Sequence, residues 1–276
     1  METMDYSGCV KAQDGYIPVG YRVDVATHYG KEREENEDNF SLNGRMRNKD
    51  EDICAFSEFL PSPLLLNVCD GMGGEQDGQL ASAIAADSSK KLLDVLPNTA
   101  EDNITDMVNS YVQDANNRIC EMLKNNYHSR GGSTFAMAYF RDNMVYPFSL
   151  GDSRIYKFFD GSLEQVTSDH TVAMNKYRMN IYTLEEAEAS ADSHKLTLFL
   201  GVDVRGNGLK AETYPAFEWK KGMTLVICSD GLYDMCSKAE ISSILESEQD
   251  NYASALLDMA MNNGGIDNIT CMVVKR

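Results

Sequence analysis

Four apolar segments of this 276-residue chain have an aspartate at one end. Asp70 follows PLLLNVC, Asp152 follows MVYPFSLG, Asp230 follows MTLVICS, and Asp267 precedes NITCMVV. A single aspartate in such a place is usually a turn former or a helix cap. Four of them at the ends of predicted strands could instead hold several carboxylates at one rim of a sheet.

Carboxylates gathered at one rim would bind a cation. They cannot all stay ionised without one, because like charges raise one another's pKa. His28, His128, His170 and His194 all lie outside the acidic segments, and oxygen ligands alone favour Mg²⁺ or Mn²⁺ over zinc. Two such ions bridged by one carboxylate and a water would yield hydroxide near neutral pH, which is suited to in-line attack on phosphorus.

Glycine is concentrated in the stretch DGMGGEQDG, which begins at Asp70. Without a Cβ, Gly71 could let its own carbonyl approach a metal, and Gly73 and Gly74 could bring backbone close to a ligand. Met72 stands between these glycines, and its thioether has no proton to give. The stretch is therefore suited to metal binding but offers no general acid.

Arg33, four residues before Glu37 and five before Asp38, is the candidate anion clamp on this acidic loop. A guanidinium can hold two phosphate oxygens at once. Arg33 could equally be a surface arginine among glutamates, and its spacing does not decide between the two. The sequence contains no motif of the competing chemistries: it has neither the Gly-x-x-x-x-Gly-Lys-Ser/Thr loop of nucleotide binding nor the Gly-x-Ser-x-Gly elbow of serine hydrolases.

Strands must position these residues, and helical patterns lie between them. Strands are predicted before or after each aspartate, and two more lie within 20–42 around a polar turn. The stretch 133–167 predicts three or four short strands, with Asp160-Gly161 as one hairpin turn. Three- and four-residue apolar spacing predicts helices at 78–96, 104–123, 183–190, 238–248 and 251–263.

The order of these elements favours a layered α+β fold over repeated βαβ units. The segment 251–263 ends before Gly264-Gly265, as a helix C-terminal cap would require. There is neither a linker-like stretch nor an internal repeat. A single domain over 1–276 is expected.

Composition narrows the class of protein further. The net charge is −18, which disfavours binding to nucleic acid or to an anionic membrane. No apolar run approaches the ~20 residues of a membrane span, and the first residues do not resemble a signal peptide. The seven cysteines include no Cys-x-x-Cys pair, and Cys69, Cys228 and Cys271 lie in apolar runs. A reducing, cytoplasmic setting is expected, with these three in the core.

Eight segments match, in order, the motifs of the type-2C metal-dependent serine/threonine protein phosphatases. They are REENEDNF (33–40), VCDGMGGEQDGQLAS (68–82), GGSTFAMAYF (131–140), SLGDSRIYKF (149–158), VTSDHT (166–171), LTLFLG (196–201), ICSDGLYD (227–234) and DNITCMVV (267–274). The chain resembles this family over nearly its full length, and DGMGG and NED are similar to its bacterial branch. The resemblance implies a four-layer αββα sandwich, with two antiparallel sheets face to face and helices outside each.

The resemblance also implies a role for each metal ligand. Asp70 would bridge two ions of Mn²⁺ or Mg²⁺, with the Gly71 carbonyl on the second ion. Asp230 and Asp267 would complete the shell of the first. Glu37 or Asp38 would contact metal-bound waters.

Further roles follow from the same resemblance. Asp152, with Asp230, matches the position of a third metal in many bacterial members. Arg33 would hold the substrate phosphate, and residues from about 171 to 195 would form a mobile flap beside the active site.

Two positions depart from the family pattern. Met72 stands where many animal members have a histidine that protonates the leaving alkoxide, although bacterial members commonly have methionine there. Leu198 replaces an arginine that is usual in the Leu-Thr-Arg-x-Leu-Gly motif. Neither change by itself implies loss of catalysis.

The implied activity is hydrolysis of phosphoserine and phosphothreonine on proteins by direct attack of a metal-bridging hydroxide. The partners would be phosphorylated proteins and a cognate serine/threonine kinase, and a monomer is expected. Two alternatives remain: a silent relative that binds phosphoproteins, and an enzyme for a regulatory or small-molecule phosphate. The acidic residues Asp70, Asp230 and Asp267 argue against the first, and nothing in the sequence excludes the second.

Overall fold

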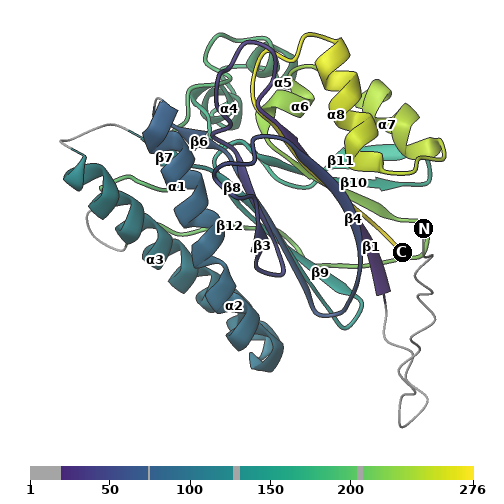
Figure 1. Cartoon of the computed structure of the whole chain (residues 1–276), viewed down its shortest axis with the longest axis horizontal. Helices are drawn as coiled ribbons and strands as arrows, with labels where there is room; N and C mark the ends of the chain where they lie inside the picture. The colour runs from purple at the N-terminus through teal and green to yellow at the C-terminus, as the bar shows by residue number, and fades with distance from the viewer. Residues whose placement is uncertain (1–19, 74, 127–130, 204–207) are drawn as a thin grey trace.

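Two antiparallel sheets form the centre of the molecule in the computed structural model, which describes residues 20–73, 75–126, 131–203 and 208–276 (Figure 1). The first sheet has the strand order β11-β10-β14-β15-β1-β4. Its strands are β1 (Gly20–His28), β4 (Cys54–Pro61), β10 (Arg154–Phe159), β11 (Ser162–Gln165), β14 (Thr224–Cys228) and β15 (Ile269–Lys275).

The second sheet has the order β12-β9-β8-β5-β2-β3, and β13 also pairs with β9. Its strands are β2 (Asn39–Leu42), β3 (Arg45–Met46), β5 (Leu64–Cys69), β8 (Phe135–Arg141), β9 (Met144–Leu150), β12 (Glu212–Thr213) and β13 (Phe217–Glu218). A small separate ribbon pairs β6 (Gly71–Met72) with β7 (Gly132–Ser133). This ribbon begins one residue after Asp70.

Helices cover the outer face of each sheet, as Figure 1 shows. On the second sheet lie α1 (Glu75–Ser88), α2 (Lys90–Val95) and α3 (Ile104–Asn125), with short 3₁₀ turns at Leu96–Asn98 and Glu101–Asn103. On the first sheet lie α6 (Asp230–Tyr233), α7 (Lys238–Glu246) and α8 (Tyr252–Asn262). The remaining helices are α4 (Val172–Arg178) and α5 (Leu184–Glu188).

Three separate hydrophobic layers make this a four-layer sandwich. Strand β8 illustrates how: Phe135 and Met137 pack toward α1 and α3, whereas Ala136 and Ala138 face the other sheet. Successive side chains of a strand point to opposite faces, so a strand covered on both faces reads as one unbroken apolar run. The αββα prediction is confirmed.

The local predictions mostly hold. The Asp160-Gly161 turn joins β10 to β11 with φ values of 50° and 74°, as a type I′ hairpin turn requires. Helix α8 ends before Gly265, whose φ of 61° and bond from its N–H to the Ala260 carbonyl (3.0 Å) form the expected cap. The expected helix 78–96 is realised as two helices, α1 and α2, and Cys69, Cys228 and Cys271 are fully buried.

Several elements were not predicted, and β4 and α4 are the longest strand and helix among them. Strand β4 is an edge strand beside β1, and half-buried residues alternate with exposed ones along it. Its sequence CAFSEFLP mixes polar and apolar residues without a clear period. Helix α4 has two turns and buries one residue, Ala173, so its sequence carries little periodic signal. In the part of the chain that is described, no helix has the length and hydropathy needed to cross a membrane.

Candidate active site

Strand register brings the acidic residues to one end of the sandwich. Asn39 of β2 pairs with Cys69 of β5, so the residues that flank them, Asp38 and Asp70, lie at the same end of these strands. In the other sheet Cys228 of β14 pairs with Cys271 of β15. The end of β14 and the beginning of β15 therefore lie side by side at one end of this sheet, and the residues beyond them include Asp230 and Asp267.

A cleft of about 600 Å³ lies at this end of the molecule. Every predicted site residue except Asp38 lines it. The lining comprises Glu32, Arg33, Glu34, Glu35, Glu37, Asp70, Gly71, Met72, Gly73, Thr134, Asp152, His194, Leu196, Asp230, Asp267 and Asn268. Residues from both sheets thus converge on one cleft; Gly74, the other glycine singled out from the sequence, lies outside the described residues.

Asp38 lies beneath the cleft and is 1% exposed. The Ser229 hydroxyl donates a 2.7 Å hydrogen bond to its Oδ2, and its own N–H donates to Oδ1 of Asn36 at 3.0 Å. Burial raises the pKa of Asp38 to about 6, and the bond from Ser229 opposes the rise. Of the two neighbouring acids, it is Glu37 that faces the cleft.

The carboxylates in the cleft destabilise one another's charge. Burial, and then repulsion from Asp230, raise the pKa of Asp70 well above its usual range. Burial, and then Asp152, do the same to the pKa of Asp230. The pKa of Asp152 is raised to about 7, by burial first and then by Asp169, and burial also raises that of Glu37 to about 7. A divalent cation would relieve this repulsion, and the donor set of carboxylate oxygens fits one.

Buried polar side chains hold the loop that carries Glu37. The Asn268 side chain donates to the carbonyls of Tyr29 (2.9 Å) and Glu35 (3.0 Å), and its oxygen accepts from the Glu37 N–H at 2.7 Å. Arg47 donates to the carbonyl of Asn36 at 2.6 Å. These positioning residues were missed from the sequence, because an asparagine or an arginine 10 or more residues away carries no local signal of such a role.

The strand end at Asp70 is held equally tightly. The Asp70 N–H donates to Oγ1 of Thr134 at 3.0 Å, and the Asp70 carbonyl accepts from the N–H of Thr134 at 2.9 Å. A Cβ on Gly71 would lie 2.2 Å from the carbonyl oxygen of Gly78 and 2.5 Å from that of Glu37. Glycine at position 71 therefore lets the backbone of β6, the beginning of α1 and the acidic loop meet.

Arg33 and Asp267 form an ion pair within the cleft, with Nη2 of Arg33 2.7 Å from Oδ2 of Asp267. The Arg33 side chain is 53% exposed, which leaves part of the guanidinium free to contact a bound anion. The structure thus places the predicted anion clamp beside a predicted metal ligand rather than on a remote surface.

The two departures from the family pattern lie in different places. Met72 lines the cleft, where β6 pairs it with Gly132. Leu198 is 40% exposed and is not among the residues that line the cleft, although Leu196 of the same motif is. The methionine is therefore the departure that bears on chemistry in the cleft.

Residues 171–195, predicted as a flap, form a small unit beside the cleft that contains α4 and α5 (Figure 1). Its two ends are joined by a bridge between Thr171 and Leu196 and by a bond from the Val172 N–H to the Lys195 carbonyl (2.8 Å). This unit carries His194 into the lining of the cleft.

The presence of His194 corrects an inference from the sequence. All four histidines are remote from the acidic segments along the chain, but the fold places Nδ1 of His194 3.6 Å from Oδ2 of Asp234. His170 is buried and bonds Glu212, and His128 lies outside the described residues. The cleft therefore offers an imidazole as well as oxygens, which sequence distance could not reveal.

The sequence is similar to known bacterial phosphatases along most of its length. A model of the family described as Protein phosphatase 2C matches residues 47–262. The serine/threonine phosphatase Stp of Listeria welshimeri is 30% identical over 240 residues, which cover 84% of this chain and 92% of that protein. The protein phosphatase PhpP of Streptococcus pneumoniae is 29% identical over 216 residues, which cover 76% and 85% of the two chains.

Solved structures give the same picture of the fold. The serine/threonine phosphatase PstP/Ppp of Mycobacterium tuberculosis superposes with a TM-score of 0.75 at 25% identity, over 93% of this chain and 99% of that one. The catalytic domain of PstP in complex with two manganese ions gives a TM-score of 0.72, again at 25% identity, over 93% and 99%. A Streptococcus agalactiae serine/threonine phosphatase has a TM-score of 0.79 at 24% identity, over 92% and 99%.

Proposed function

The chain belongs to the protein phosphatase 2C family and is a serine/threonine protein phosphatase of the bacterial type, and from this premise we propose that it hydrolyses phosphoserine and phosphothreonine with the help of Mn²⁺ or Mg²⁺. The observation that carries the proposal is the convergence of Asp70, Asp152, Asp230 and Asp267 on one cleft. Their shared repulsion and their oxygen donors suit divalent cations.

Each acid has a place in this proposal. Asp70 and the Gly71 carbonyl would hold the cations together with Asp230 and Asp267, and Glu37, whose backbone lies beside Gly71, would contact their waters. Asp152 and Asp230 would accept a third cation. When bound, the ions supply a water of lowered pKa for in-line attack on phosphorus and neutralise charge on the phosphate, so that no phosphoenzyme is needed. Asp38, buried below and bonded by Ser229, keeps the cleft negative without entering it.

Arg33 positions the substrate phosphate. Its guanidinium already lies in the cleft, and the exposed part can hold two phosphate oxygens. Met72 has no proton to transfer, so the proton for the leaving serine or threonine oxygen comes from water. In the bound substrate the phosphate would therefore contact Arg33, and the leaving oxygen would face water.

The partners follow from the same proposal. The substrates are phosphorylated proteins, and a serine/threonine kinase makes them. We place the enzyme in the cytoplasm as a monomer with one catalytic domain over 1–276 and without nucleic-acid or membrane partners. The net charge of −18 supports the exclusion of nucleic acid and anionic membranes.

Hydrolysis of a phosphothreonine peptide with added Mn²⁺, Mg²⁺ or EDTA tests the proposal. We expect activity with either metal and none in EDTA. Asp230→Asn should abolish activity while the thermal unfolding curve in EDTA stays cooperative. Asp142→Asn, at an 82% exposed turn position with a φ of 51°, is the matched control and should retain full activity. Equal activity in EDTA would rule out the mechanism.

A further inference from the structure

His194 brings a nitrogen ligand to two acids of the catalytic end of the molecule. One ligand atom from each of His194, Asp230 and Asp234 lies within 4.8 Å of the others. Asp230 and Asp234 are on and just after α6, one helical turn apart, and His194 comes from the flap segment 171–195. We propose that these three residues form a mixed nitrogen–oxygen cation site that ties the flap segment to α6. This inference rests on the proposed function, because Asp230 would also serve the catalytic ions.

The separation of His194 and Asp234 fits a shared cation better than a direct contact. Nδ1 of His194 is 3.6 Å from Oδ2 of Asp234, which is too long for a hydrogen bond. Two ligands that each lie ~2.1 Å from one cation are roughly 3.0 Å apart when adjacent and roughly 4.2 Å apart when opposite. The observed separation falls between these values.

The two carboxylates are also free to bind. Within the described part of the chain, neither the Asp230 nor the Asp234 carboxylate accepts a hydrogen bond, and the ion pair with His194 is the contact that Asp234 makes. By contrast, the buried Asp38 and Asp169 carboxylates accept hydrogen bonds from Ser229 and Arg154. The pair at α6 therefore has unused oxygen lone pairs that face an imidazole.

Two cavities meet at His194. It lines the catalytic cleft together with Asp230, and it also lines a neighbouring cavity of about 570 Å³ together with Asp234. This second cavity is lined by residues of the flap segment, such as Ala187, and by residues near α6 and α7, such as Lys238.

The flap segment is well braced within itself and weakly joined to α6 and α7. Asp192 pairs with Lys176 at 2.5 Å and with Lys195 at 2.7 Å, which fixes the neighbours of His194 to α4. Toward α6 and α7, the ion pairs of the described residues are His194–Asp234 at 3.6 Å and Lys238–Glu188 at 3.9 Å. A cation at His194 would therefore add the strongest tie between the two parts.

The donor set also predicts which ion would tie the flap. Imidazole nitrogen suits Mn²⁺ and later transition metals, whereas Mg²⁺ prefers oxygen and retains its waters. Mn²⁺ should therefore recruit His194, and Mg²⁺ should occupy the oxygen ligands without it. The identity of the ion would then decide how firmly the flap segment is held over the cleft.

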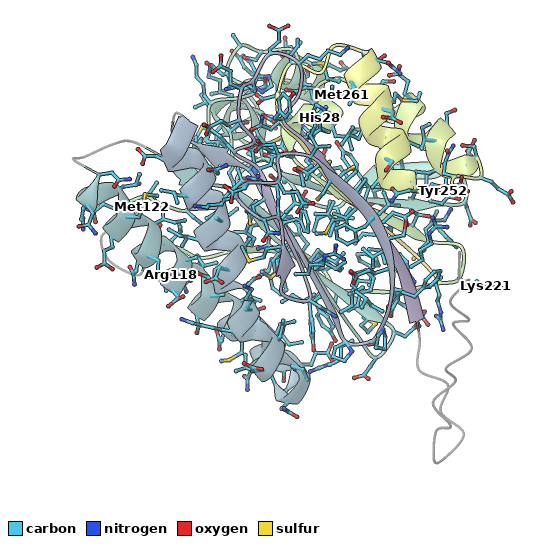
Figure 2. All side chains as sticks on the ribbon, in the orientation of Figure 1. His28, Arg118, Met122, Lys221, Tyr252 and Met261 are labelled. Atoms are coloured by element: carbon cyan, nitrogen blue, oxygen red, sulfur yellow. The ribbon has the colours of Figure 1, made fainter. Side chains whose placement is uncertain are left out.

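Electron spin-echo spectroscopy of bound Mn²⁺ tests the site directly. With protein labelled with ¹⁵N-histidine, we expect a nitrogen coupling to Mn²⁺ that changes with the isotope. His194→Gln should lose the coupling, and His28→Gln should retain it, because His28 lies at the end of β1 near Asp258 of α8 (Figure 2). Mn²⁺ that binds and supports hydrolysis without any histidine coupling would overturn this inference and leave the proposed function intact. Failure of Mn²⁺ to bind at all would overturn both.

Limited trypsin digestion within the flap segment gives an independent readout. Cleavage after Lys176 and Arg178 should be several-fold slower in Mn²⁺ than in Mg²⁺. The difference should disappear in His194→Gln. Glu188→Gln removes the other ion pair without touching a proposed ligand, so it should keep the difference between the metals. Equal digestion of the parent protein in the two metals would contradict a Mn²⁺-dependent tie.

Discussion

The hydroxyl of Ser229 donates a 2.7 Å hydrogen bond to Oδ2 of Asp38, across a separation of 191 residues. Ser229 follows β14 in the first sheet, and Asp38 precedes β2 in the second. The same hydroxyl accepts a bond from the N–H of Thr270, at the beginning of β15, at 3.0 Å. One side chain therefore joins the strand ends of both sheets beneath the acidic cleft.

Removal of this hydroxyl should destabilise the protein. Ser229→Ala leaves a buried carboxylate oxygen and a buried N–H without their partner, which costs about 1–3 kcal/mol in the free energy of unfolding. The cost should be greater at pH 8 than at pH 5, because Asp38, whose pKa is raised to about 6, is ionised at the higher pH. Urea unfolding in EDTA measures it. Ser242→Ala, which removes an exposed hydroxyl on α7, is the control and should stay within about 0.5 kcal/mol.

Gly71 should not tolerate a side chain. In Gly71→Ala the new Cβ would overlap the carbonyl oxygens of Gly78 and Glu37, and backbone atoms cannot move aside as the end of a side chain can. We expect a loss of more than about 2 kcal/mol in the free energy of unfolding, together with weaker metal binding. Calorimetric metal titration and urea unfolding measure the two effects. Gly20→Ala, where nothing lies within 4 Å of the new Cβ, is the matched control; equal behaviour of the two variants would contradict the prediction.

Metal-free protein should lose stability as the pH rises. Glu37 and Asp152 have their pKa values raised to about 7, and Asp38 to about 6, whereas carboxyls of an unfolded chain titrate near ~4. Between pH ~4 and ~7 the folded protein therefore binds more protons than the unfolded chain, so the free energy of unfolding falls as the pH rises.

Added Mn²⁺ should reverse this trend, because the ion binds ionised carboxylates and stabilises the folded state that holds it. Urea unfolding at pH 5, 6, 7 and 8, with EDTA or with Mn²⁺, separates the two regimes. Greater stability of the EDTA-treated protein at pH 8 than at pH 5 would show that these carboxylates do not dominate the pH dependence.

Met72→His should supply the proton that, in the proposed mechanism, comes from water. A protonated imidazole beside the leaving oxygen would speed hydrolysis of a phosphoserine peptide below pH ~6.5, where histidine is charged. Hydrolysis of p-nitrophenyl phosphate should change little, because its leaving group needs no proton. The pH–rate profiles of the two substrates measure the effect, and identical profiles for variant and parent would mean that position 72 does not face the leaving group.

Much of the fold was predictable because it rests on local patterns. The apolar run before Asp70 and the three- and four-residue spacing at 104–123 predicted β5 and α3, since burial of a strand or of a helix face needs those periods. Asp160-Gly161 predicted its hairpin through the positive φ values that such residues tolerate. Strand β4 and helix α4 were missed because they bury little and carry no clear period.

The sequence by itself determined which residue types could do chemistry and where strands would end: Asp70, Asp152, Asp230 and Asp267 stand beside apolar runs, and their number implied cations. Only the tertiary structure decided that Glu37 rather than Asp38 faces the cleft, and that His194 lies beside Asp234. The physical reason is that periodicity and turn chemistry act between near neighbours along the chain. Which distant residues meet depends on how both sheets pack and pair in register, and those contacts leave no trace in local spacing.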